Sequence, residues 1–107
     1  MKLSELQNKF IFKTRIDLDD EDYIVLREPN TAEISEMSED EKKNMKVMEK
    51  ILPNCIVETS ITKDDGSFAT GKEICDILKE SGSIFTEVLG IWIQSIPFNS
   101  RLNSKEK

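Results

Sequence analysis

Apolar and polar residues alternate along residues 10–16, the pattern of a strand with one buried and one solvated face. A second run, residues 23–28, is rich in the β-branched and aromatic side chains that favour strands. Only the short acidic segment 17–22 separates the two runs, so we expect them to pair as an antiparallel hairpin. Residues 55–62 predict a third strand.

Helical patterning begins after the second strand. Ser38 and Glu41 match a capping box, in which the N-cap hydroxyl and a glutamate three residues later satisfy the first backbone N–H groups. Pro53 has no N–H to donate, so this helix is predicted to end at Leu52. Its apolar stripe consists of Met45, Met48, Ile51 and Leu52. Shorter helical segments are expected at residues 3–9 and 31–37.

Two more helices are predicted in the C-terminal third. Thr70 and Glu73 form a second capping box, and Gly82 is the expected stop of that helix. Ser83 is predicted to open the last helix, which Pro97 ends. The apolar residues of this last helix occupy more than one face, which indicates deep burial or an additional contact with a partner.

These elements predict an α+β fold, a small antiparallel sheet (hairpin plus a third strand) packed against three to four helices. A chain of 107 residues with 37% hydrophobic side chains is long enough for one core. We therefore expect a single domain at residues 1–98 and a polar, flexible C-terminal tail at residues 99–107.

Charge is unevenly distributed along the chain. The whole sequence has a net charge of −6, but residues 17–41 contain eleven acidic residues and a single arginine, a net charge of −10. This segment is either a docking face for a basic partner or a solvated turn followed by an acid-rich helix start. An EF-hand calcium loop is disfavoured, because Asp22 stands where the sharp turn requires glycine. The acidity also argues against nucleic-acid binding.

The sequence shows no assembled catalytic, cofactor or metal site. Histidine is absent, which removes the commonest general base and a favoured zinc ligand. Cys55 and Cys75 lie among apolar neighbours and are expected to be buried, reduced thiols. The acidic pair Asp64 and Asp65 precedes Gly66, which is typical of an exposed turn rather than of a catalytic pair. We expect a protein that is not an enzyme and has no membrane-spanning segment.

Four residues are the candidates for contact with a partner protein. Met45 and Met48 belong to a methionine-containing helical stripe, and methionine adapts well to variable apolar surfaces. Trp92 and Ile93 are part of three consecutive large apolar residues, which cannot all point inward from one helix. The alternative is that all four belong to the core.

The order of these segments resembles the small tail assembly chaperones of long-tailed phages and prophages. The resembling segments are Phe-Ile-Phe-Lys, Tyr-Ile-Val-Leu-Arg-Glu-Pro with the acidic helix after it, Ile-Leu-Pro-Asn-Cys-Ile-Val, the Asp-Asp-Gly turn and Phe-Thr-Glu-Val-Leu-Gly-Ile-Trp-Ile before Pro-Phe. They extend from about Phe10 to Phe98 and so cover most of the chain.

This resemblance implies a non-enzymatic role in the cytoplasm of a bacterial host. Proteins of this kind bind the hydrophobic, helical tape measure protein during tail morphogenesis and tend to self-associate around it. A structural or adaptor component of a phage tail, or another small oligomeric scaffold protein, is the alternative.

Overall fold

The computed structural model describes residues 1–98, so the tail expected at residues 99–107 lies outside the described part of the chain. The helices and strands, in chain order, are α1 (Leu3–Phe10), β1 (Lys13–Asp17), β2 (Tyr23–Arg27), α2 (Thr31–Ile34), α3 (Glu41–Cys55), β3 (Ile56–Thr59), α4 (Gly71–Leu78) and α5 (Gly82–Ser95). The predicted α+β class is confirmed. The described residues contain five helices, of which α2 is a single turn. No helix in this range combines the length and the apolar character needed to cross a bilayer.

The sheet has the strand order β1-β2-β3, and both neighbouring pairs are antiparallel. Ile16 of β1 pairs with Ile24 of β2, which pairs in turn with Thr59 of β3. The predicted hairpin of β1 and β2 is therefore confirmed. In the acidic loop between these strands, Asp19 Oδ1 accepts hydrogen bonds from the backbone N–H groups of Glu21 (2.8 Å) and Asp22 (2.6 Å). These acidic residues thus form the turn itself.

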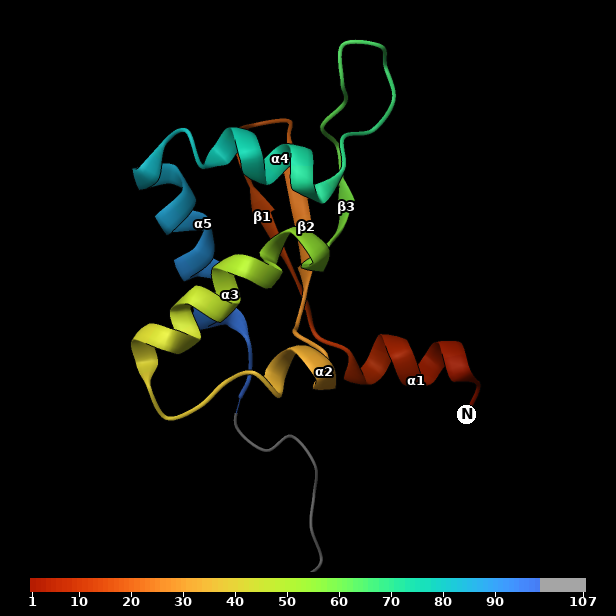
Figure 1. The fold of residues 1–107 in the computed structure, drawn as a ribbon. Helices are drawn as coiled ribbons and strands as arrows, with labels where there is room; N and C mark the ends of the chain where they lie inside the picture. The colour runs from red at the N-terminus through yellow and green to blue at the C-terminus, as the bar shows by residue number, and fades with distance from the viewer. Residues whose placement is uncertain (99–107) are drawn as a thin grey trace, which may run out of the picture.

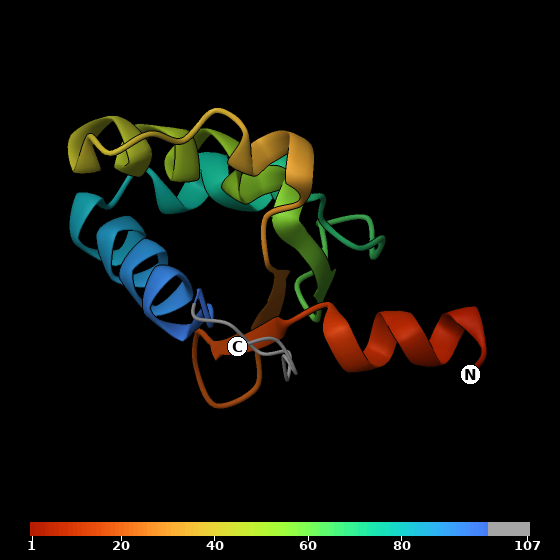
Figure 2. The ribbon, with the colours of Figure 1, turned by 90° about the horizontal axis from the view of Figure 1, so that it is seen from below.

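One face of the sheet forms the floor of the hydrophobic core. Ile16, Ile24 and Leu26 are buried on that face, because alternate strand residues point to the same side. Helices α3, α4 and α5 lie together on that side (Figures 1 and 2). They contribute most of the remaining buried side chains, which are Val47, Met48, Ile51, Leu52, Cys55, Ile74, Cys75, Phe85, Val88, Leu89 and Trp92.

The opposite face of the sheet carries polar side chains beside Val25. Arg15 on β1 lies over the ring of Tyr23, with its guanidinium carbon 3.9 Å from the ring centre. The Tyr23 hydroxyl donates a hydrogen bond of 2.9 Å to Glu58 on β3. An antiparallel sheet with one core face and one solvated face accounts for this difference.

Helix α1 extends away from the three core helices (Figure 2). All of its residues are exposed except Phe10, which is half-buried. The expectation of a strand starting at Phe10 is wrong, because this residue closes α1 and β1 begins at Lys13. Leu3, Leu6 and Phe10 follow helical spacing, which competes with the alternation of residues 10–16.

The boundaries of α3 also differ from the prediction. Its N-cap is Asp40, not Ser38, and the Asp40 carboxylate accepts from the N–H groups of Lys42 (3.0 Å) and Lys43 (3.3 Å). Pro53 does not stop the helix, which continues to Cys55. A proline this close to the end removes one backbone hydrogen bond, and the extra turn places Cys55 fully in the core.

The segment between α3 and α5 matches the prediction in part. The capping box of Thr70 and Glu73 is confirmed, and Gly66 has a φ of 91°, as expected for the turn. Helix α4 ends at Leu78, whereas Gly82 is the first residue of α5 and Ser81 is its N-cap. The expected stop at Gly82 and start at Ser83 are therefore wrong. In Ser-Gly-Ser, either serine could cap the next helix.

Candidate functional site

The four predicted contact residues do not form one surface. Trp92 is fully buried and its indole N–H donates a 3.1 Å hydrogen bond to the carbonyl oxygen of Arg27. Met48 is also buried, and Ile93 is half-buried and packs against the core. Met45 is exposed. In this conformation the side chains of Met48 and Trp92 are core residues, which is the alternative that the sequence left open for them.

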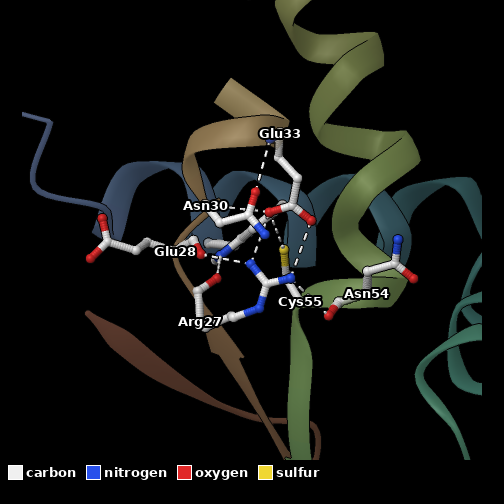
Figure 3. Close-up of polar contacts among 7 residues, drawn as sticks. Arg27, Glu28, Asn30, Glu33, Asn54 and Cys55 are labelled. Carbon is white, nitrogen blue, oxygen red and sulfur yellow. Dashed lines mark hydrogen bonds and ion pairs between the residues drawn. The ribbon is translucent and has the colours of Figure 1, made fainter. Parts of the chain in front are cut away.

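The polar cluster around Arg27 joins β2, α2 and the end of α3 (Figure 3). The Arg27 guanidinium donates to both carboxylate oxygens of Glu33, at 2.8 and 3.1 Å. It also donates to the carbonyl oxygens of Glu28 (3.0 Å) and Asn54 (3.3 Å). Asn30 and Glu33 add reciprocal capping bonds at the start of α2. This network fixes three elements relative to one another.

The ionisation of the groups in this cluster is consistent with a structural role. The hydrogen bonds from Arg27 hold the pKa of Glu33 below its usual range and raise that of Arg27. The Cys55 thiol lies 3.9 Å from a Glu33 oxygen, and burial raises its pKa to about 12. A thiol with this pKa stays protonated near neutral pH, so it is a poor nucleophile. The cluster therefore holds β2, α2 and the end of α3 together.

The other thiol and the acidic turn residues have structural surroundings. Burial raises the pKa of the Cys75 thiol to about 11. Across residues 1–98, no group of three or more cysteine, aspartate or glutamate side chains is arranged to hold a metal ion. Asp65 accepts hydrogen bonds from the N–H and hydroxyl of Ser67, so it acts as a turn residue.

Helix α1 carries the first exposed apolar stripe. Leu3 is 85% exposed and Leu6 is 46% exposed. With Phe10 they have the spacing i, i+3, i+7, so their side chains lie along one side of the helix. Sequence reasoning missed this surface, although the same spacing in residues 3–10 was the signal that could have revealed it.

A groove continues from this stripe toward α2. Its volume is about 520 Å³, and it is bounded by the end of α1, by residues 27–30 and by the start of α2. Ile11 and Ile34 line it and are each 42% exposed. Arg27 also lines it, so the ion pair with Glu33 stiffens one wall. The stripe and the groove, called the α1 surface below, comprise Leu3, Leu6, Phe10, Ile11 and Ile34.

Helix α5 also presents apolar side chains outward. Ile84 and Ile91 are seven residues apart and exposed, while Trp92 faces the core. The expectation that the Ile-Trp-Ile run cannot point inward as a whole is confirmed, but Ile91 is the residue that faces out. Ile84 and Ile91 line a groove next to Leu18, and the volume of this groove is only about 90 Å³.

The chain was compared with protein-family models, with curated proteins and with solved structures. None of these comparisons found a match to the sequence or to the fold.

Proposed function

We propose that this protein is a non-enzymatic tail assembly chaperone of a phage or prophage. In this role it binds a hydrophobic helical client, the tape measure protein, in the bacterial cytoplasm during tail morphogenesis, and it can self-associate around that client. The observation that carries the proposal is the exposed apolar stripe of α1, in which Leu3 and Leu6 are the most exposed members. The family resemblance supplies the identity of the client.

A helix of this kind is suited to a helical partner. Isolated helices shorter than about 12–15 residues are marginal in water, and α1 has only eight residues. Packing an apolar stripe against another helix removes it from water, which stabilises both helices. The groove beside Ile11 and Ile34 extends the contact beyond the end of α1. A client helix could therefore pack along α1 and reach α2.

Exposed apolar stripes also suit transient rather than permanent binding. The stripe is short, so its burial supplies limited affinity, and a chaperone must release its client when the tail assembles. A structural tail component would use the same side chains in a lasting contact. The two roles differ in whether the protein remains in the finished tail.

The test is a pull-down of the tagged protein from cells that also make the products of its neighbouring genes. We expect it to capture a long helical protein, and we expect the double variant L3S/L6S to capture several-fold less, since both apolar contacts are lost. The matched control is Val57→Ser, because Val57 is exposed to a similar extent (48% against 46% for Leu6) but lies on β3.

Three results would count against the proposal. A strict monomer that captures no long helical protein contradicts the chaperone function itself. Equal capture by the double variant and the wild type excludes the α1 surface as the binding site. Retention of the protein in purified tails supports the structural role instead.

A further inference from the structure

The apolar stripe of α4 is covered on only one side. Ile74 is buried against the core and Leu78 is half-buried, but Ile77, on the same apolar arc, is 67% exposed. Residues three and four apart on a helix are neighbours, so Ile77 continues the stripe past the edge of the core. This helix thus presents an apolar flank that the core does not use.

An ordered hairpin-like loop faces this flank. The loop, residues 61–69, extends from the end of β3 and returns to the start of α4 (Figure 1). Lys63 N–H donates to Ser67 O (2.7 Å) and Ala69 N–H donates to Ile61 O (3.0 Å), which closes the loop on itself. The turn at Gly66 permits this closure. The wall that faces α4 therefore has a defined shape.

A groove of about 540 Å³ lies between the loop and α4, and we call it the α4 groove. Its apolar lining comes from both sides, from Ile61, Ala69, Ile74, Ile77 and Leu78. The volume falls within the range of about 300–1,000 Å³ that is typical of ligand sites. The α4 groove is separate from the α1 surface, because the two share no lining residue.

The charged residues that line the groove are mostly acidic. Asp64, Glu73 and Asp76 contribute three carboxylates, and Lys63 contributes one ammonium group. Asp76 is already paired with Lys72 on the next turn of α4, at 2.9 Å, so Asp64 and Glu73 are the carboxylates that an incoming cation would use. Glu73 is held in place because its Oε1 accepts from the Thr70 N–H at 2.9 Å. Its Oε2 lies 3.8 Å from Lys63 Nζ, a loose and exposed ion pair. An incoming cation can therefore compete with Lys63 for a carboxylate that is already oriented.

We propose that the α4 groove binds a basic amphipathic segment of another protein. An apolar side chain of that segment packs on Ile77 and Ile74, while its lysine or arginine side chains pair with Asp64 and Glu73. Charge complementarity selects this partner over an acidic segment, for which the like charges around the groove are unfavourable. The proposal stands apart from the client-binding function, because it uses other residues and a different chemistry.

The test uses two fluorescein-labelled peptides and fluorescence anisotropy. One peptide is an amphipathic helix of leucine and lysine, and the other has glutamate in place of every lysine. We expect only the lysine peptide to bind, with an affinity that falls as salt is added. Ile77→Ser and Asp64→Lys are each expected to weaken binding about tenfold, the loss typical of a contact that contributes about 1.4 kcal/mol.

Two control variants distinguish binding in the groove from non-specific attraction to acidic or apolar surfaces. Asp20→Lys reverses a charge in the exposed loop between β1 and β2, and Ile91→Ser removes an exposed isoleucine from α5. Both should bind the lysine peptide as the wild type does. A loss as large in Asp20→Lys as in Asp64→Lys would overturn the proposal, because binding would then follow net charge alone.

Self-association is the competing outcome. The N-terminal part of α3 carries Lys42, Lys46 and the exposed Met45, which is itself a basic amphipathic segment. If the protein is oligomeric by sedimentation and Ile77→Ser makes it monomeric, the occupant is a second copy and the proposal of a foreign partner is overturned. Failure of the lysine peptide to bind a monomeric wild type would overturn it as well. Neither result bears on the L3S/L6S pull-down, so the two proposals can fail separately.

Discussion

Helices α5 and α1 bury their apolar side chains to very different extents. α5 places Phe85, Val88, Leu89 and Trp92 in the core, and the Trp92 indole also bonds to a backbone carbonyl of β2. α1 leaves Leu3 and Leu6 exposed. Both segments have apolar side chains at helical spacing, so the difference comes from what the rest of the chain places opposite them.

This difference indicates that α5 serves mainly the stability of the fold, whereas α1 is available for binding a partner. Burial of apolar area stabilises a fold by roughly 25 cal/mol per Å², and α5 supplies much of that area while α1 supplies little. We therefore expect substitutions of the buried side chains of α5 to destabilise the fold strongly, and substitutions on α1 to leave the protein folded. The predictions below test this separation.

The largest effect is expected at Trp92. Trp92→Ala removes a fully buried indole and its hydrogen bond to Arg27 O, so the free energy of unfolding should fall by about 3–5 kcal/mol. Urea denaturation monitored by circular dichroism measures the loss. A fall below about 1 kcal/mol would mean that α5 is not the anchor of this core.

The next effect is expected at Gly71, the first residue of α4. A β-carbon added here would clash with the carbonyl oxygen of Pro53, at the close approach of α3 and α4. Gly71→Ala should therefore cost about 1–3 kcal/mol in unfolding free energy. Gly90→Ala is the matched control, since a β-carbon there meets open space and alanine favours the helix by about 0.5–1 kcal/mol. Equal effects from both changes would disprove the close packing.

The ion pair between Arg27 and Glu33 predicts a pH effect. The hydrogen bonds from Arg27 in the folded state lower the pKa of Glu33 below its ordinary value of 4.5. The pair therefore stabilises the fold fully above pH 4.5. This stabilisation is lost as the pH falls through the lower pKa of the folded state. Glu33→Gln should cost about 1–3 kcal/mol at neutral pH, since the side chains are only 13% and 22% exposed. The difference between wild type and variant should shrink on acidification.

Glu36→Gln is the control for this experiment. Glu36 pairs with Lys50 at 3.4 Å, but both side chains are largely exposed, so its loss should cost about 0–1 kcal/mol. Urea midpoints at several pH values distinguish the two variants. A gap between wild type and Glu33→Gln that stays constant with pH would rule out ionisation of Glu33 as its cause.

The smallest effect is expected at Leu6. Leu6→Ser replaces a half-exposed side chain of α1, so the free energy of unfolding should change by about 0.5 kcal/mol or less. The measurement is the same urea titration used for Trp92. A loss of several kcal/mol would show that α1 belongs to the cooperative core, and the contrast with α5 would then fail.

Sequence patterning predicted the element types well because the strands and the long helices follow clear periods. The boundaries were harder where two signals compete. Ser38 and Asp40 both suit an N-cap, and Asp40 takes that position while Ser38 instead bonds with Asn44. Pro53 predicts a stop, yet α3 continues past it to Cys55, which is buried in the core. Local propensity does not include these long-range contacts.

The candidate surfaces were predicted less well, because exposure depends on what the fold places opposite each side chain. Trp92 and Ile91 are adjacent in sequence, and the packing of α5 against β1, α3 and α4 decides which of them is buried. Phe68 is a large apolar residue, yet it is 67% exposed in the loop before α4. The α4 groove needs residues from both the loop and α4, which no single sequence period reveals.

The buried position of Trp92 also provides an intrinsic fluorescence signal for folding. The chain contains one tryptophan, so its ultraviolet emission has a single source. That indole lies away from water at the junction of α5 and β2. Its emission should therefore shift to longer wavelength when the core opens and stay unchanged when a partner binds at α1. A single label-free spectrum can thus distinguish a variant that has lost its partner from one that has lost its fold.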